Sequence, residues 1–185
     1  MKVTSLDLKG LMLIELVIHG DGRGFFTERF QAARFRDNGL PTNFVQENHS
    51  RSSTGTLRGL HYQYRPAQGK LVGVIRGQIW DVVVDIRPDS ATYGRSPGLE
   101  LSDKNGCVLW IPPGSAHGFC ALGEEPADVL YHVDAFNSPS GEGGIFWADP
   151  DLSIPWPISR PVVSERDQKL PRFAEYRAHP VRWNV

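Results

Sequence analysis

The stretch that decides the fold is KLVGVIRGQIWDVVVDIR, which runs from Lys70 to Arg87. It contains two apolar runs rich in β-branched residues, and such residues favour extended strands. Gly77 stands between the two runs, and a glycine turn between two strand-like segments is typical of a β-hairpin. We therefore expect strands over residues 70–76 and 79–87, paired with each other.

Shorter segments on both sides of this stretch have the same strand-like character. They are Leu11–Ile18, Cys107–Ile111 and Val129–Val133. Only Phe30–Asn38 has a helical pattern, and Gly39 after it suits a helix C-cap. From Asp149 onward the chain is rich in proline and tryptophan and predicts an irregular segment. The pattern indicates an all-β fold of sandwich or barrel type, with a short N-terminal helix and an irregular C-terminal segment.

The bulk composition is that of an ordinary globular protein. A length of 185 residues suits one domain over residues 1–185, and a net charge of -1 gives no basic field for nucleic acid or an anionic membrane. Cys107 and Cys120 form no disulfide framework, which indicates a reducing compartment. The apolar run near the N-terminus is too short to span a bilayer and is interrupted by Glu15. We expect a cytoplasmic protein.

Two motifs have the spacing of metal-binding barrel proteins but lack part of the usual ligand set. The first is Gly59-Leu-His61-Tyr-Gln63 followed by Lys70, and the second is Pro112-Pro-Gly-Ser-Ala-His117. This spacing resembles the cupin family of small antiparallel jelly-roll barrels, whose metal-binding members add a further histidine and a glutamate. Two neutral imidazoles beside a lysine are too few ligands for a tight divalent site. We therefore expect no metal and no cofactor.

The residues that replace the metal ligands suit proton transfer at a carbon next to a ketone. Such a reaction needs a base, positive charge for the enolate oxygen, and an acid on the opposite face. His61 is a natural base because the ordinary pKa of histidine lies near neutrality. Lys70 could supply the positive charge, and Tyr131 could supply the acid.

Longer motifs make the resemblance more specific. The sequence resembles the dTDP-4-dehydrorhamnose 3,5-epimerase family from about Asp21 to Asp167. The matching motifs are Asp21-Gly-Arg-Gly-Phe-Phe-x-Glu28, Val45-Gln-Glu-Asn-His-Ser50, Leu57-Arg-Gly-Leu-His61, Gln68-Gly-Lys70, Ile111-Pro-Pro-Gly-Ser-Ala-His117, Ser140-Gly-Glu142 and Ser164-Glu-Arg-Asp167.

The resemblance implies roles that spacing alone does not show. His61 would be the base with Asp167 as its carboxylate partner, Lys70 would lie at the sugar C4 oxygen, and Tyr131 would be the acid. The residues implied in substrate binding are Arg23, Phe26, Glu28, Gln46, Asn48, Arg58, His117 and Glu142. The implied reaction inverts C3 and C5 of dTDP-4-dehydro-6-deoxy-D-glucose to give dTDP-4-dehydro-L-rhamnose. The implied assembly is a homodimer.

Three other interpretations remain open at this point. Where the family commonly has an aromatic pair after Tyr131, this chain has Phe136-Asn137, so a relative that inverts only C3 or only C5 is one alternative. A metal-dependent cupin is the second. The third is a nucleotide-sugar-binding barrel without turnover, which would be favoured if His61 had no carboxylate partner in space.

Overall fold

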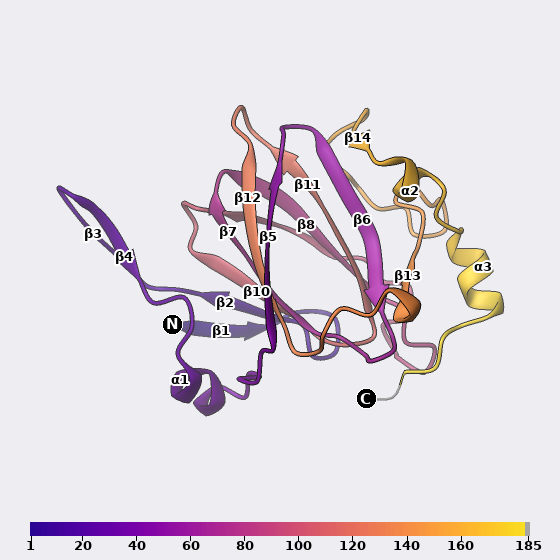
Figure 1. Cartoon of the computed structure of the whole chain (residues 1–185), viewed down its shortest axis with the longest axis horizontal. Coiled ribbons are helices and arrows are strands. Elements are labelled where there is room, and N and C mark those ends of the chain that lie inside the picture. Colours follow the sequence, from indigo (N-terminus) through magenta and orange to yellow (C-terminus); the bar gives the residue numbers. More distant parts are fainter. Residues whose placement is uncertain (184–185) are drawn as a thin grey trace.

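The structure is a computed structural model that describes residues 1–183. Two β-sheets pack against each other, a two-stranded hairpin projects from one end, and short helices lie around the body (Figure 1). This is the all-β, jelly-roll architecture that the sequence predicts.

The first sheet is antiparallel, and its edge strands are the short β1 and the longer β5. Its order is β1 (Lys2–Ser5), β2 (Met12–Glu15), β10 (Cys107–Ile111), β7 (Lys70–Arg76), β12 (Ala127–Val133) and β5 (Gln46–Ser52). The second sheet has the order β13 (Glu142–Gly144), β6 (Thr56–Gln63), β11 (Ser115–Leu122), β8 (Gln78–Asp85) and β9 (Gly98–Ser102), and β14 (Val162–Val163) pairs in parallel with β6. The projecting hairpin is β3 (Ile18–Asp21) with β4 (Gly24–Thr27).

Apolar side chains from both sheets meet in a central core. Val72 and Val74 of β7 and Val83 of β8 belong to this cluster and are almost completely buried. Successive side chains of a strand point to opposite faces, so each sheet turns one face inward and the other outward. Full burial of each large aliphatic side chain contributes roughly 1.5–3 kcal/mol, which makes this cluster the main source of stability.

The outer face of each sheet is covered by a smaller apolar layer. Phe35 of α1 (Ala32–Asp37) packs with Leu71 and Trp110 on the first sheet. On the second sheet, α3 (Phe173–Ala178) packs Phe173 and Tyr176 on a cluster that includes Leu60. The remaining short helices are η1 (Pro139–Gly141) and α2 (Glu165–Gln168).

The prediction that the two strands at Lys70–Arg87 form a hairpin is wrong. Both strands exist, but β7 pairs with β10 and β12 whereas β8 pairs with β11 and β9. Gly77 has a φ of 77°, and Asp103 holds it by hydrogen bonds of 3.0 and 3.1 Å to its N–H and carbonyl. The turn therefore carries the chain from one sheet to the other. Because β8 is buried along most of its length, it requires a strand on each edge and packing on both faces.

Other expected elements fit with adjusted bounds. The strands at 107–111 and 129–133 are confirmed as β10 and part of β12, and the helix is shorter than expected, with Gln31 as its N-cap. The run Leu11–Ile18 divides into β2 and the start of β3. The C-terminal segment is more regular than predicted, because it contains α2 and α3.

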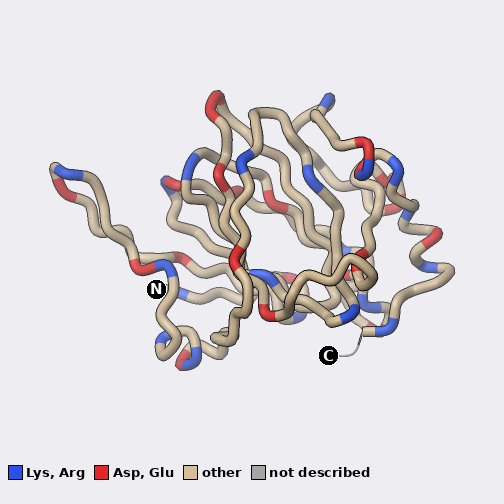
Figure 2. The backbone as a smooth tube through the Cα atoms, viewed as in Figure 1, with Lys and Arg blue, Asp and Glu red and all other residues tan. Residues whose placement is uncertain are grey.

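Charge is distributed over the whole molecule. Acidic and basic residues are interspersed along the backbone, and no single-sign region dominates the view (Figure 2). Both cysteines are free thiols. No helix within residues 1–183 is long and apolar enough to cross a membrane.

Candidate active site

A cavity lined by both histidine-bearing strands opens where β6 and β11 depart from regular pairing. His117 pairs with His61, but Phe119 pairs with Arg58, so the register shifts between them. In a regular strand, Arg58 and His61 would point to opposite faces because they are three residues apart. The irregularity turns both side chains into one cavity of about 530 Å³, which we call the central cavity.

Two glycines make this irregularity possible. Gly59 has a φ of 130°, and a Cβ added there would lie 2.6 Å from the Cα of Gly118. A Cβ at Gly118 would in turn lie 2.8 Å from the carbonyl oxygen of Arg58. The two backbones approach each other too closely for any side chain, and this contact places His61 beside the cavity.

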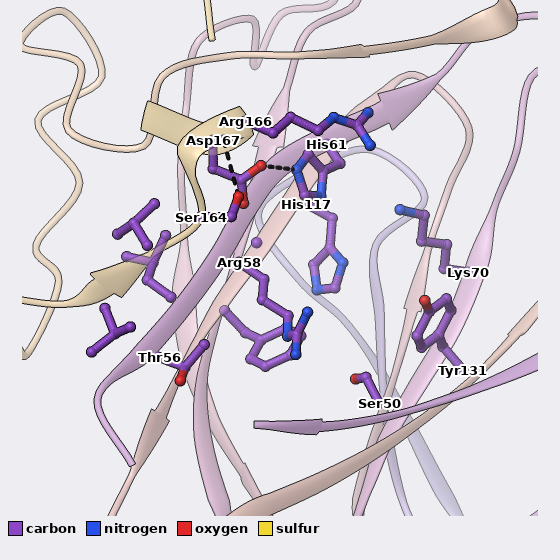
Figure 3. A pocket seen from close by; sticks show the side chains of 15 residues that line it. Ser50, Thr56, Arg58, His61, Lys70, His117, Tyr131, Ser164, Arg166 and Asp167 are labelled. Atoms are coloured by element: carbon purple, nitrogen blue, oxygen red, sulfur yellow. Dashed lines mark hydrogen bonds and ion pairs between the residues drawn. The ribbon is translucent and has the colours of Figure 1, made fainter. Parts of the chain in front are cut away.

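His61 forms a short pair with the buried carboxylate of Asp167. The distance from His61 Nε2 to Asp167 Oδ1 is 2.7 Å, and Asp167 Oδ2 accepts a hydrogen bond of 3.2 Å from the N–H of Gly59 (Figure 3). The hydroxyl of Ser164 caps α2 by accepting from the N–H of Asp167. Burial alone would raise the pKa of Asp167, but the contacts with His61, Gly59 and Ser164 outweigh it and keep that pKa below its usual value. The carboxyl therefore remains ionised next to the imidazole.

A second histidine–carboxylate pair lies deeper in the barrel. His117 Nε2 is 2.8 Å from Oδ2 of Asp81, and both side chains are buried. Each imidazole thus uses its Nε2 on its own carboxylate. Among residues 1–183, no group of three or more histidine, cysteine, aspartate or glutamate side chains is placed to hold a metal ion.

The first sheet contributes Lys70 and Tyr131 to the opposite wall (Figure 3). Tyr131 pairs with Val72 and Val133 pairs with Lys70, so the two side chains occupy diagonal positions on one face. Burial lowers the pKa of Lys70 to about 8, although the carboxylates of Asp81 and Glu142 act in the opposite direction. Burial also raises the pKa of Tyr131, which keeps its phenol protonated at neutral pH. The wall therefore offers a cation and a neutral proton donor.

Cationic side chains flank the entrance. Arg58 is oriented by hydrogen bonds to Ser52 Oγ (2.9 Å) and to the carbonyl of Arg51 (3.1 Å). Arg166, from α2, forms a 2.7 Å ion pair with Glu142 of β13. Guanidinium groups held in this way are suited to the oxygens of an anionic ligand.

A smaller cavity of about 310 Å³, which we call the side cavity, adjoins the central one. The two cavities share His61, Lys70, Tyr131 and Arg166. Its further lining includes Gln46, Asn48 and Glu142. The N–H of Asn137 donates to Gln46 Oε1 (3.3 Å), and Gln46 Nε2 donates to Asn48 Oδ1 (2.8 Å). Since a backbone N–H can only donate, this chain of contacts leaves the amide N–H groups of Asn48 for a ligand.

The structure therefore brings together nine of the predicted site residues. They are His61, Tyr131, Asp167, Lys70, Arg58, His117, Gln46, Asn48 and Glu142. The other three, Arg23, Phe26 and Glu28, do not reach either cavity. Arg23 and Phe26 lie on the projecting hairpin, with Arg23 paired to Asp21 at 2.6 Å, and Glu28 follows it and pairs with Arg34 at 2.9 Å (Figure 1).

Three polar residues at or beside the cavities were not singled out from the sequence. Ser50 and Arg166 line the central cavity, and Asp81 lies behind His117. Both Ser50 and Arg166 stand inside motifs that carry the family resemblance, next to residues that were chosen. Asp81 could have been noticed as one of two aspartates in a mostly apolar strand, where a buried charge requires a partner.

Gln63 has a structural role in place of a metal ligand. Its Nε2 donates to the carbonyls of Pro66 and Phe136, and its Oε1 accepts from the N–H of Ser138. One buried carboxamide thus joins the loop after β6 to the loop after β12. This bonding fixes the wall of the side cavity.

The sequence profile of the dTDP-4-dehydrorhamnose 3,5-epimerases matches residues 5–175 of this chain. The chain belongs to the dTDP-4-dehydrorhamnose 3,5-epimerase family. A curated family member from Pseudomonas aeruginosa is 46% identical over 182 residues, which cover 97% of this chain and 100% of that protein. The solved structure of an epimerase from Legionella pneumophila, in complex with dTDP-4-keto-L-rhamnose, is 41% identical with a TM-score of 0.93. That match covers 100% of this chain and 98% of the other.

Membership confirms the predicted family, the jelly-roll fold and the class of enzyme, an isomerase of the dTDP-4-dehydrorhamnose 3,5-epimerase type. The fold also accommodates a narrower reaction. A 3'-monoepimerase from Streptomyces bikiniensis, solved with dTDP-quinovose, is 33% identical with a TM-score of 0.88 and covers 94% of this chain and 88% of that one. The carboxylate of Asp167 lies 2.7 Å from His61. A barrel that only bound a nucleotide sugar would not need this carboxylate.

Proposed function

We propose that this epimerase inverts C3 and C5 of dTDP-4-dehydro-6-deoxy-D-glucose, with His61 as the base and Tyr131 as the acid. The observation that supports the proposal is that opposite walls of the central cavity carry different functional groups. His61 with its carboxylate is on one wall, and a lysine beside a tyrosine is on the other. A base and an acid on opposite sides of one carbon are what inversion requires.

The hydrogen bond to Asp167 determines which nitrogen of His61 acts. An ionised carboxylate only accepts, so the neutral imidazole carries its hydrogen on Nε2 and leaves Nδ1 unprotonated. Nδ1 then takes the proton from the carbon next to the C4 ketone. The imidazolium that forms is stabilised by Asp167 behind it, as in other histidine–carboxylate pairs.

Removal of the proton leaves an enolate whose charge rests on the C4 oxygen. The Lys70 ammonium stabilises this oxygen as a point charge in a partly desolvated site. Tyr131 then donates its phenolic proton to the opposite face of the same carbon, which inverts it. Exchange with water returns a proton to Tyr131 and removes one from His61, so the cycle closes without net loss. The same cycle at the other carbon next to the ketone inverts the second centre.

Substrate binding would use the cations at the entrance and the amides of the side cavity. Arg58 and Arg166 suit the diphosphate, because their planar donors match phosphate oxygens. The amide N–H groups of Asn48 suit a sugar oxygen. Glu142 would help by orienting Arg166, to which it is joined at 2.7 Å.

A second subunit would complete the site. The β3–β4 hairpin carries Phe25 and Phe26 with 64% and 69% of their surfaces exposed, and an isolated two-stranded hairpin is only marginally stable in water. A homodimer that inserts this hairpin near its partner's cavity would bury both rings. It would also add Arg23, Phe26 and Glu28 to the nucleotide end of the site. A cytoplasmic location remains the expectation for such an enzyme with free cysteines.

The test is proton NMR in D2O with dTDP-4-dehydro-6-deoxy-D-glucose, following deuterium at C3 and C5. We expect incorporation at both carbons and formation of the L-rhamno product. His61→Ala should reduce exchange at both carbons by about 10²–10⁴-fold, because it removes the base. His179→Ala, a change at an exposed histidine, is the matched control. Incorporation at one carbon only would assign the enzyme to the monoepimerases, with Asn137 at the side cavity as the first position to examine. Wild-type exchange in His61→Ala would overturn the role of His61.

A further inference from the structure

Asp81 is a buried carboxylate for which the reaction above has no use. It lies on β8 with none of its surface exposed. Its Oδ2 is 2.8 Å from His117 Nε2, but its Oδ1 is buried and accepts no hydrogen bond from any of residues 1–183. A buried charge that is only half satisfied is unfavourable unless a nearby positive charge compensates it.

Lys70 lines the central cavity from the other sheet, and His117, the hydrogen-bond partner of Asp81, lines the same cavity. No hydrogen bond or ion pair within 4 Å joins the ammonium of Lys70 to residues 1–183, and yet two carboxylates favour its charged form. Asp81 has the larger influence and Glu142 the smaller. The other polar and ionisable side chains that line the cavities around Lys70 are His61, His117, Tyr131, Arg58 and Arg166. Of the two carboxylates, Glu142 is already joined to Arg166 at 2.7 Å, whereas Asp81 has no cationic partner of the lysine or arginine type within 4 Å in the described chain.

We propose that Asp81 is a positioning residue, which orients His117 through one carboxylate oxygen and keeps Lys70 in its ammonium form through the charge of the carboxylate. The two effects are separable in principle. An asparagine in its place can still accept from His117 Nε2 but carries no charge. Only the link from a charged Lys70 to turnover rests on the proposed function, because charge on Lys70 is a property of the free enzyme.

The direction of the effect follows from the sign of the charges. Burial already lowers the pKa of Lys70 to about 8, and Asp81 opposes this lowering. Without the negative charge the pKa falls further, so a larger fraction of Lys70 is neutral at pH 7–8. Since the ammonium is the form that stabilises an enolate, activity at that pH falls while activity at lower pH persists.

The primary test is a titration of Lys70 in the free, full-length enzyme. Reductive methylation with ¹³C-formaldehyde labels lysine amines, and the ¹³C shift of each methyl group reports its protonation. The Lys70→Arg variant identifies the Lys70 signal by its absence. We expect a midpoint near pH 8 in the wild type and a midpoint about one pH unit lower or more in Asp81→Asn. Asp81→Glu, which retains the charge, should return the midpoint most of the way toward the wild-type value.

The matched control is Asp128→Asn. Asp128 is also a buried carboxylate with a histidine partner, His49 at 3.0 Å, but it lies outside both cavities. We expect it to leave the Lys70 midpoint unchanged. If Asp81→Asn does not fold, as judged by near-UV circular dichroism, Asp81→Ser removes the same charge with a smaller side chain. A Lys70 midpoint in the charge-removing variant equal to that of the wild type would overturn the proposal.

A second measurement shows whether the effect reaches the reaction. As the pH is raised, the rate of deuterium exchange in Asp81→Asn should begin to fall at a lower pH than in the wild type. The deficit should be about fivefold or more at pH 8 and should shrink toward pH 6.5. If the Lys70 midpoint moves but the wild type exchanges neither carbon of the dTDP-sugar, the proposed function fails and the role of Asp81 in charging Lys70 stands. If the exchange rate of Asp81→Asn were lower than that of the wild type by the same factor at every pH, the role of Asp81 would be purely structural.

Discussion

Asp167 accepts hydrogen bonds through both of its side-chain oxygens. One oxygen accepts from Nε2 of His61, and the other accepts from the N–H of Gly59. The hydroxyl of Ser164 caps the helical turn from which Asp167 projects. The side chain is thereby held in one orientation, and so is the imidazole. A base that is already aligned before the substrate arrives loses little freedom on reaching the transition state.

At this scale we expect Asp167→Asn to lower deuterium exchange at both carbons by roughly 10²–10³-fold, with substrate affinity within a few fold of the wild type. The amide retains the shape of the carboxylate but can neither stabilise the imidazolium nor select the Nε2–H tautomer. Single-turnover exchange and a binding isotherm with dTDP separate the two quantities. Asp151→Asn, at an aspartate paired with Arg177 on the surface, should match the wild type. An equal loss in affinity and exchange would mean that Asp167 supports the pocket rather than the base.

The residues of this dyad show where reasoning from sequence ends. His61 could be chosen because its spacing to Lys70 and His117 has a chemical meaning. Asp167 could not, because 106 residues separate it from His61 and only the resemblance to known epimerases singled it out. Nothing local in Ser164-Glu-Arg-Asp167 distinguishes a catalytic carboxylate from an ordinary helix start.

At the scale of elements, the irregular pairing of β6 with β11 decides which side chains face the cavity. Regular pairing would turn either Arg58 or His61 out of it. The strand pattern alone does not reveal this, since the irregularity depends on close approach of two glycines that lie 59 positions apart. The polar strand β5 was also not predicted, because its residues alternate between the cavity and the solvent with few apolar side chains.

Gly59→Ala should destabilise the protein by about 3 kcal/mol and lower Tm by roughly 6–12 °C. The new Cβ would meet backbone atoms of Gly118 at a positive φ that alanine rarely adopts. Differential scanning calorimetry measures the change. Gly22→Ala is the control, because no atom lies within 4 Å of its added Cβ and its φ is outside the left-handed region. We expect that variant to stay within about 0.5 kcal/mol of the wild type. Equal melting of both variants would contradict the importance of the close approach.

At the scale of the whole molecule, the hairpin and the Asp167 helix lie at opposite ends of the long axis (Figure 1). The hairpin therefore cannot serve the cavity of its own barrel without a large movement. Composition and strand pattern predicted the all-β architecture, and the motifs predicted most of the pocket. The position of Arg23, Phe26 and Glu28 outside the pocket could not be predicted, because a sequence motif does not state where in the fold its residues lie.

Subunit complementation tests the shared site. His61→Ala retains an intact hairpin, and an Arg23→Ala, Phe26→Ala double variant retains an intact barrel. Each alone should have little activity. After the two are mixed and allowed to exchange subunits, half of the dimers are hybrids and each hybrid has one complete site. We expect recovery of about a quarter of wild-type activity. Size-exclusion chromatography with light scattering confirms the dimer, and mixing without recovery would show that the hairpin does not serve a neighbour.

The late position of Asp167 along the chain also affects how the enzyme is made. During synthesis the strands that carry His61, Lys70 and Tyr131 leave the ribosome first, and the barrel can begin to assemble around them. The carboxylate that holds the His61 imidazole emerges only with the segment after β14. A polypeptide that ends at a premature stop codon before Ser164 would therefore present a substrate pocket with an unsupported histidine. Such fragments would also lack Arg166 from the wall of the central cavity, so the last helices make activity conditional on nearly full translation.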